Sequence, residues 1–141
     1  PCMYYGDEIG LTNEAGFDSR NCFPWDEQQW DQETLEFYRK LIALRRGSLA
    51  LARGEFEVLH YEQDLLVFAR VLGEEWVLVT ANRSETPHPP LRLDLPALNL
   101  GDEREFLPLF GSGKIKAGCG WLELPEILKG GEVWQQTGLR L

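Results

Sequence analysis

The sequence predicts a mainly β protein, an antiparallel Greek-key β-sandwich preceded by a single helix. Two observations lead to this fold class. The spacing of apolar residues changes from three or four to two near residue 47, and about eight short apolar runs follow with turn residues, not helices, between them. A chain of 141 residues that is 43% hydrophobic can bury a real core. We therefore expect two regions, residues 1–46 and residues 47–141.

The first region is expected to hold a short strand, a long loop and a helix. Met3 to Tyr5 is apolar enough for a strand, whereas Gly6 to Trp30 is rich in Gly, Asn, Asp and Pro and has no sustained period. Loops of that length in compact domains are usually functional or disordered. From Asp31 to Arg46 the apolar residues recur at helical spacing, with Asp31 as the expected N-cap. The apolar face of this helix needs a partner.

The second region is expected to consist of short strands. The predicted strands are Glu55–Tyr61, Leu65–Leu72, Glu75–Asn82, Leu91–Leu95, Glu105–Phe110, Lys114–Ala117, Trp121–Leu124 and Glu132–Gln136. The second and third, joined by Gly73 and Glu74, make the clearest hairpin. Because both are almost continuously apolar, we expect central strands that are covered on both faces. Gly111 to Lys114 lacks the spacing of a phosphate-binding loop and is expected to be a hairpin turn.

Charge and cysteine content exclude several classes of protein. The net charge of −9 argues against nucleic acid as a partner. The apolar runs are far shorter than the roughly 20 residues of a membrane span, and no signal peptide is evident, so no membrane is expected. Cys2, Cys22 and Cys119 have no metal-like spacing and suit reduced thiols in a cytoplasm, each expected to be a small buried hydrophobe. No cofactor or metal motif is present, and the start at Pro1 suggests a piece of a longer protein.

No catalytic residue is assigned from the sequence. Asp7 and Glu8 are adjacent, and neighbouring side chains on an extended chain point to opposite faces. A retaining glycosidase, in contrast, places its two carboxyl groups about 5–5.5 Å apart across one bond. A turn, a backbone hydrogen-bond acceptor or an ion-pair partner is the favoured interpretation of both acids. His60 and His88 have no Ser, Cys or acid at a spacing that suggests a triad.

The loop around Trp25 and Trp30 is the best binding candidate. Both aromatic residues lie in a polar segment, with Asp18, Arg20, Asp26 and Glu27 around them. A flat aromatic face can stack on the apolar face of a sugar ring, and a sugar carries no charge to be repelled. The alternative is a mini-core that holds the loop against the helix. Trp76, in a strongly apolar strand, is expected in the core.

The order of these segments resembles the α-amylase family of glycoside hydrolases, family 13. The resemblance rests on Tyr4-Tyr5-Gly6-Asp7-Glu8-Ile9-Gly10, on the loop with Asp18, Arg20 and Phe23-Pro24-Trp25-Asp26-Glu27, on the helix ending Leu41–Arg46, and on the strands containing Val67–Arg70 and Ala81–Arg83. The loop is most similar to those of cyclomaltodextrinases, neopullulanases and maltogenic amylases. These enzymes act on α-1,4, and in some cases α-1,6, links of maltodextrins or cyclodextrins.

The resemblance implies that residues 1–46 are the last strand, loop and helix of a (β/α)8 barrel and that residues 47–141 are the C-terminal β-sandwich. The family's three catalytic carboxylates lie on earlier barrel strands, and this chain has no His-Asp dipeptide that matches the third. It implies a retaining enzyme without a redox cofactor, of which this chain alone is catalytically incomplete. The implied substrate-binding residues are Asp7, Arg20, Trp25 and Asp26.

The same resemblance implies partners for the chain. Its own catalytic barrel is the first, and a maltodextrin-type sugar at the barrel mouth is the second. Without the barrel, the exposed helix face predicts that residues 1–46 are either poorly ordered or held by another copy in a homo-oligomer, for example by segment exchange. The alternative function is a non-catalytic carbohydrate-binding or protein-interaction module.

Overall fold

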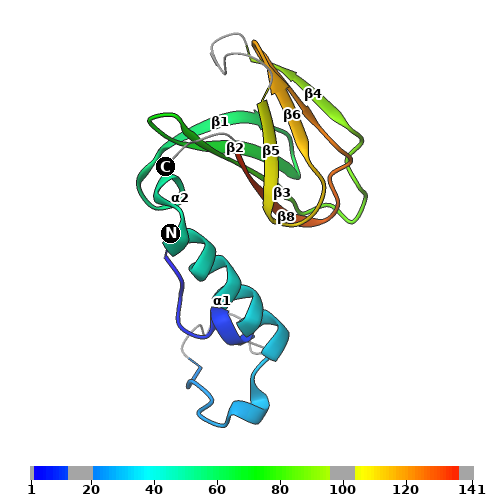
Figure 1. Cartoon of the computed structure of the whole chain (residues 1–141). Helices are drawn as coiled ribbons and strands as arrows, with labels where there is room; N and C mark the ends of the chain where they lie inside the picture. Colours follow the sequence, from blue (N-terminus) through cyan, green and yellow to red (C-terminus); the bar gives the residue numbers. More distant parts are fainter. Residues whose placement is uncertain (1, 13–20, 96–103, 137–141) are drawn as a thin grey trace. The chain divides into compact units, whose positions relative to one another are not determined.

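The chain forms two compact units, Pro1–Gly47 and Ser48–Leu141, in a computed structural model (Figure 1). The structure describes residues 2–12, 21–95 and 104–136. In the described residues no helix is both long and apolar enough to cross a bilayer.

The first unit is built around one helix and two short turns. These are the 3-10 turns η1 (Asp7–Ile9) and η2 (Glu27–Gln29) and the helix α1 (Gln32–Gly47). The predicted cap of α1 is confirmed, because Asp31 Oδ1 accepts hydrogen bonds from the backbone N–H groups of Glu33 and Thr34, each at 3.0 Å. Yet α1 contains no buried residue, and its apolar residues Phe37 and Ile42 are exposed among the described residues.

The strand predicted at Met3 to Tyr5 is wrong. Tyr5 belongs to a turn in which the backbone N–H of Asp7 donates to the carbonyl of Tyr4 at 3.1 Å. A strand is stable only when its backbone groups pair with a neighbouring strand. The described residues of the first unit include no other strand, so this apolar segment has nothing to pair with.

The second unit begins with a short helix and continues as strands. The helix α2 is Leu49–Arg53, and the strands are β1 (Glu55–Tyr61), β2 (Leu65–Leu72), β3 (Glu75–Asn82), β4 (Leu91–Asp94), β5 (Arg104–Phe110), β6 (Ile115–Gly118), β7 (Trp121–Leu124) and β8 (Gly130–Gln136). Every predicted strand of this region is present within two residues of its expected ends. The predicted hairpins at Gly73 and at Gly111 to Lys114 are also confirmed, each with glycine at positive φ.

The eight strands form one antiparallel sheet in the order β1-β2-β3-β8-β5-β6-β7-β4. The sheet curls until its two halves face each other, with β1, β2, β3 and β8 in one layer and β5, β6, β7 and β4 in the other (Figure 1). The order β4-β7-β6-β5 is a Greek key. The mainly β fold class is therefore confirmed, as a nearly closed single sheet.

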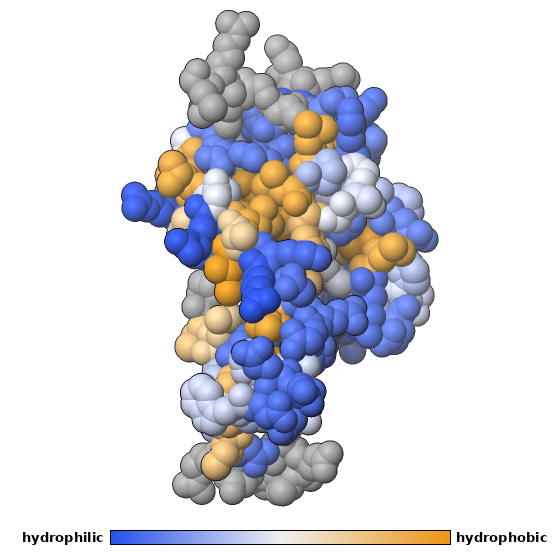
Figure 2. Space-filling view, turned by 60° about the horizontal axis from the view of Figure 1, so that its bottom comes forward, coloured by the Kyte–Doolittle hydropathy of each residue, from blue (hydrophilic) through white to orange (hydrophobic). Residues whose placement is uncertain are grey.

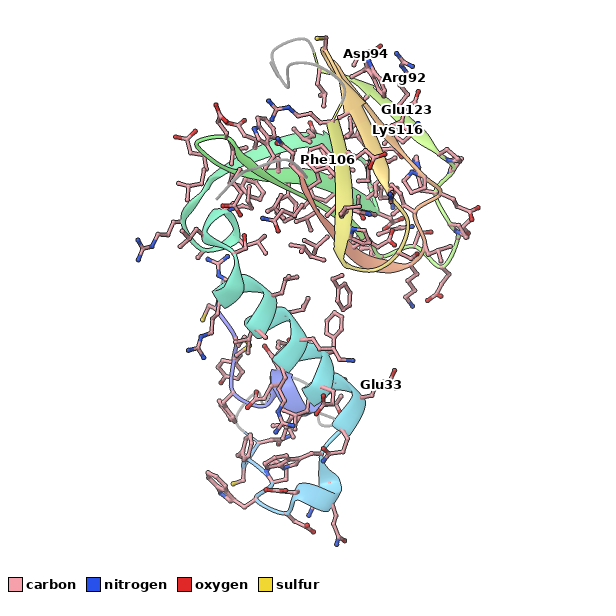
Figure 3. All side chains as sticks on the ribbon, in the orientation of Figure 1. Glu33, Arg92, Asp94, Phe106, Lys116 and Glu123 are labelled. Atoms are coloured by element: carbon pink, nitrogen blue, oxygen red, sulfur yellow. The ribbon has the colours of Figure 1, made fainter. Side chains whose placement is uncertain are left out.

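The core lies between these two layers. Its largest fully buried side chains include Trp134 of β8 and Phe106 of β5, which is labelled in Figure 3, together with Leu78 of β3 and Leu122 of β7. Trp76 is partly buried and packs against this cluster, as predicted. Because both layers contribute to one cluster, the unit supplies its own hydrophobic core.

The expectation of buried cysteines is wrong. Cys2, Cys22 and Cys119 are all exposed, and none of them is in a disulfide bond. Cys119 lies in the turn between β6 and β7, and Cys22 in the loop before η2. Turn positions follow no alternation that would direct a side chain into the core, so the general preference of cysteine for burial does not apply here.

Candidate functional site

The turn η1 has a fixed shape because it lies between two glycines at positive φ. Gly6 has φ 91° and Gly10 has φ 68°, a backbone region in which glycine is favoured. A Cβ atom on Gly6 would also lie 2.6 Å from Leu11 Cδ2. Ile9, between the glycines, is buried with 3% of its surface exposed. The geometry of this short turn thus follows from its own sequence.

Both acids of this turn accept hydrogen bonds from the nearby backbone. Asp7 Oδ2 accepts from the N–H of Tyr4 at 3.0 Å, and Glu8 Oε2 accepts from the N–H of Gly6 at 2.9 Å. This is the role of backbone acceptor that the sequence favoured. A carboxylate that accepts one such bond keeps lone pairs for a further donor, such as a sugar hydroxyl.

The segment before α1 contains a small aromatic cluster. The ring of Phe23 lies 5.0 Å from that of Trp25 and 5.9 Å from that of Trp30, centroid to centroid. Trp30 Nε1 donates to the carbonyl of Pro24 at 2.7 Å, which ties the indole to the loop. Asp26 Oδ1 accepts from the N–H of Gln28 at 3.1 Å and so caps η2.

The two tryptophans of the loop have different surroundings. Trp30 is half-buried among Phe23 and Pro24, as the mini-core alternative predicts, whereas Trp25 is 86% exposed. An exposed indole held on one side by a neighbouring ring offers a flat apolar surface to a ligand. The sequence did not distinguish these two roles, since both residues lie in the same polar segment.

The turns that carry three of the predicted site residues lie next to the start of α1. The backbone N–H of Asp31 donates to the carbonyl of Ile9 at 3.1 Å, which joins η1 to the residue that caps the helix. The turn η2, with Trp25 and Asp26 before it, ends directly ahead of the same helix. Asp7 of η1 and the pair Trp25 and Asp26 before η2 thus each lie on a segment next to the start of α1. Arg20 and Asp18 lie outside the described residues.

A polar hollow beside these turns was not predicted. It has a volume of about 440 Å³ and is lined by Ile9, Gly10, Leu11, Thr12, Asn21, Cys22, Pro24 and Gln29. Its walls are held by two bonds, from Tyr5 Oη to the Asn21 carbonyl at 2.9 Å and from Asn21 Nδ2 to the Thr12 carbonyl at 3.4 Å. The amide residues Asn21 and Gln29, on either side of the aromatic cluster in the sequence, could have indicated this hollow.

The electrostatics of this end are those of a capped helix. The hydrogen bond from the Thr34 hydroxyl to Asp31 Oδ2, at 2.7 Å, and those from the backbone N–H groups of Thr34 and Glu33 lower the pKa of Asp31. Within the described ranges no group of three or more His, Cys, Asp or Glu is arranged to hold a metal ion. The arrangement is suited to stacking and hydrogen bonding with a neutral ligand.

This chain matches a small part of several larger curated proteins. The chain is 39% identical over 97 residues to a cyclomaltodextrinase of Geobacillus thermopakistaniensis, a match that covers 67% of the chain and 16% of that enzyme. It is 36% identical to the intracellular maltogenic amylase of Bacillus subtilis (59% and 15% covered) and 35% identical to neopullulanase 2 of Thermoactinomyces vulgaris (60% and 15%). The chain thus spans 15% to 16% of the length of these relatives.

Solved structures match nearly the whole chain. An α-amylase of Geobacillus thermoleovorans, complexed with acarbose, superposes with a TM-score of 0.78 over 98% of this chain and 30% of its own, at 20% identity, which shows the fold alone. A debranching enzyme of Nostoc punctiforme is 30% identical, with a TM-score of 0.73 over 94% of this chain and 27% of its own. A second structure of that enzyme, soaked with acarbose, also matches, at 29% identity, a TM-score of 0.67 and 94% and 25% coverage.

No family model matches the chain. The pairwise matches nevertheless agree with one another, since the related sequences and structures align a small part of a larger enzyme with most of this chain. The chain therefore corresponds to the C-terminal portion of enzymes of the cyclomaltodextrinase, maltogenic amylase and neopullulanase type in the α-amylase family of glycoside hydrolases.

Proposed function

We propose that this chain is the C-terminal part of a retaining α-glucan hydrolase that acts on α-1,4 or α-1,6 links of maltodextrins or cyclodextrins. The observation that carries the proposal is the 39% identity to a cyclomaltodextrinase, together with similar identities to a maltogenic amylase and a neopullulanase. In such an enzyme one carboxylate attacks the sugar to form a covalent intermediate, and a second acts as acid and base. We assign neither carboxylate to this chain, which is catalytically incomplete alone.

In the proposed enzyme, residues 1–46 complete the barrel and residues 47–141 form the C-terminal domain. The turns at the start of α1 then belong to the mouth of the barrel, the end at which substrates bind in this fold. Trp25 stacks on a sugar ring, while Asp7, Asp26 and Arg20 hydrogen-bond to sugar hydroxyls. The exposure of Trp25 and the hydrogen bonds that already orient Asp7 and Asp26 support these roles. We place the protein in the cytoplasm, which agrees with its three cysteines being outside disulfide bonds.

The decisive experiment compares this chain with the longer protein encoded by the same gene. We expect the longer protein to release reducing sugar from maltodextrins and cyclodextrins, and the chain alone to release none. Turnover by the purified chain would contradict the proposal. So would a gene that encodes no preceding region with a His-Asp dipeptide and the other two catalytic acids.

The sugar contact is tested by substitution in the longer protein. Trp25→Ala removes the stacking surface, and we expect KM for maltodextrin to rise about tenfold, equivalent to about 1.4 kcal/mol, with kcat little changed. Trp25→Phe is the matched control, because it keeps a flat ring and should restore most of the affinity. Equal KM values for all three proteins would remove Trp25 from the site.

The second candidate function is a non-catalytic carbohydrate-binding module, and the 86% exposure of Trp25 is the observation that favours it. It predicts that the chain alone binds maltooligosaccharides, with quenching of tryptophan fluorescence that is lost in Trp25→Ala. A flat titration to high sugar concentration would eliminate it.

A further inference from the structure

The two edge strands of the sheet are linked by a cluster of three titratable side chains. β1 and β4 stand at the two ends of the strand order, so within the described sheet they are not hydrogen-bonded to each other. His60 belongs to β1, Glu62 follows that strand, and His88 lies in the connection from β3 into β4. Glu62 Oε1 lies 3.0 Å from His60 Nε2, and Glu62 Oε2 lies 3.6 Å from His88 Nε2. We call these three residues the seam cluster.

The backbone on both sides of the seam cluster is held by hydrogen bonds. The N–H of His88 donates to the carbonyl of Ile127, and the N–H of Ile127 donates back to the carbonyl of His88, each at 2.9 Å. Asn82 Nδ2 donates to the same Ile127 carbonyl at 3.0 Å. In the turn between β1 and β2, the N–H of Glu62 donates to the carbonyl of Leu65 at 2.8 Å. The side chains of the cluster therefore extend from fixed backbone positions.

The cluster lies beside a hollow of about 240 Å³ between that turn and the connection into β4. Glu62 and His88 both line the hollow, one from each segment. The side chain of His88 is 19% exposed and that of His60 is 25% exposed, whereas that of Glu62 is 51% exposed. Water reaches the cluster at the carboxylate, so its protons can exchange with the solvent.

The contacts of the His88 ring determine where its protons must be. Nδ1 lies 2.7 Å from the carbonyl oxygen of Pro89, and a carbonyl can only accept, so Nδ1 carries a proton. In a neutral ring Nε2 then carries a lone pair, which faces the negative charge of Glu62 Oε2. In the doubly protonated ring Nε2 also carries a proton, and both contacts are attractive. The contact between His88 and Glu62 is therefore favourable only in the charged form of the histidine.

The contact of His60 with the same carboxylate does not have this requirement. Its Nε2 lies 3.0 Å from Glu62 Oε1, and a neutral ring with its proton on Nε2 donates this hydrogen bond. Protonation of His60 adds charge to a bond that is already formed. His88 is thus the member of the cluster whose contact with Glu62 depends on a further proton.

The other charged residues of the segments around the cluster form two ion pairs and one exposed carboxylate. They are Asp64 with Arg83, Glu85 with Lys129, and Glu126. Figure 2 shows hydrophilic residues over much of the molecular surface, and single exposed ion pairs of this kind contribute little to stability. Among the described residues, Glu62 is the carboxylate that lies at ion-pair distance from His88. The charge of Glu62 is therefore the one that a proton on His88 meets.

We propose that the seam cluster is a proton-operated clasp between the two edges of the sheet. A proton on His88 closes the contact with Glu62 and so ties the end of β1 to the segment that enters β4, and loss of that proton opens the contact. Histidine as a class changes its charge between about pH 5 and 8, a range in which glutamate as a class stays charged. The clasp is closed at the acid end of this range and open at its alkaline end. This inference goes beyond the proposed function, since none of the three residues belongs to the candidate sugar site.

The first test observes the ring protons directly and needs no substitution. NMR shifts of the ring nitrogens of this chain distinguish the charged imidazole from its two neutral tautomers. At the acid end of the range we expect both ring nitrogens of His88 to be protonated. At the alkaline end we expect a neutral His88 with its proton on Nδ1 and a neutral His60 with its proton on Nε2. A neutral His88 with its proton on Nε2 would overturn the proposal.

The second test measures whether the proton holds the segment in place. The backbone N–H of Ile127 belongs to the bridge with His88, and its protection from hydrogen exchange is compared at the two ends of the range after correction for the intrinsic effect of pH. We expect protection in the wild type to fall about threefold at the alkaline end, the size of one partly exposed ion pair. Glu62→Gln should remove this change, because an amide can pair with either form of the His88 ring. His88→Gln should remove it as well, because the new side chain does not titrate.

Two control variants keep the proposed proton site. Glu123→Gln weakens the pair of Glu123 with Arg92, 2.9 Å apart and labelled in Figure 3, which contains no histidine. His60→Gln keeps a neutral donor to Glu62. Both variants should retain the threefold change. The proposal would be overturned by a wild type without the change, by an equal change in Glu62→Gln, or by a change that is lost in His60→Gln and kept in His88→Gln.

Discussion

The two units of the molecule differ in how much they bury. The second unit encloses a cluster that both layers of its sheet share, with Phe106 and Trp134 fully buried. In the described residues of the first unit, Ile9 is the one buried hydrophobic residue, and the helix α1 buries none. The difference teaches that the sheet unit has a hydrophobic core of its own, whereas the described residues of the helical unit do not form one.

The largest effect is expected from the core of the sheet unit. Trp134→Ala removes a fully buried indole, and we expect it to lower the free energy of unfolding by about 3–5 kcal/mol. Trp25→Ala is the matched control in the first unit, where the exposed ring should contribute less than about 0.5 kcal/mol. Urea denaturation, followed by far-UV circular dichroism, measures both. Equal losses would mean that the two units share one core.

A smaller loss of stability is expected from substitution of one glycine in each unit. Gly6→Ala and Gly73→Ala each place a side chain at positive φ, at a cost of about 1–2 kcal/mol, and Gly6→Ala also clashes with Leu11. We expect Gly73→Ala to lower the urea midpoint of the sheet unit and Gly6→Ala to leave it unchanged. Gly6→Ala should instead accelerate hydrogen exchange at Leu11, whose N–H donates to the Gly6 carbonyl at 2.9 Å. A midpoint that falls equally in both variants would show that the units unfold together.

The smallest effect concerns the cap of α1. The pKa of Asp31 is lowered by its hydrogen bonds with Thr34 and Glu33. The folded form therefore gains stability above the ordinary Asp value of 3.8, and this gain is lost as the pH falls through the lowered pKa. We expect the amide of Thr34 to lose protection from hydrogen exchange in that range. Asp31→Asn, a cap that does not titrate there, should show no such step, and an identical step in both proteins would exclude Asp31 as its source.

The exposed apolar residues of α1 allow the oligomer hypothesis to be tested. Phe37 and Ile42 of this helix are exposed. Self-association through residues 1–46 stays a prediction, and so does the assignment of this region to a barrel. Sedimentation of the chain, with and without residues 1–46, measures this self-association.

The sheet unit could be predicted closely from the sequence because its strands alternate, or are apolar throughout, and end at glycine turns. The segments at β1, β2, β3 and β7 have the predicted ends for this reason. The single continuous sheet could not be predicted, since which strands pair depends on contacts between distant residues. The pairing of β8 with both β3 and β5 joins the two layers. Nothing in the local sequence of β8 indicates these partners.

The candidate site could be predicted only as a set of residues. The sequence indicated Asp7, Trp25 and Asp26, and the structure places them near the start of α1. It did not indicate which tryptophan is exposed, because Trp30 differs from Trp25 only in its hydrogen bond to Pro24 and its half-buried position. The apolar segment Met3 to Tyr5 misled for a physical reason, since strand formation depends on a neighbour that the segment's own sequence does not contain.

The strand β1 lies at one edge of the sheet and carries features that resist the addition of further strands. Its register shifts between Val58 and His60, a bulge that interrupts the regular ladder. Glu57 pairs with Ala69 and so lies on the inner face of the sheet at this edge. A further strand that paired with β1 would have to bury the charge of Glu57. A solution of this protein should therefore resist growth into cross-β fibrils, and any aggregate should form by contact between faces.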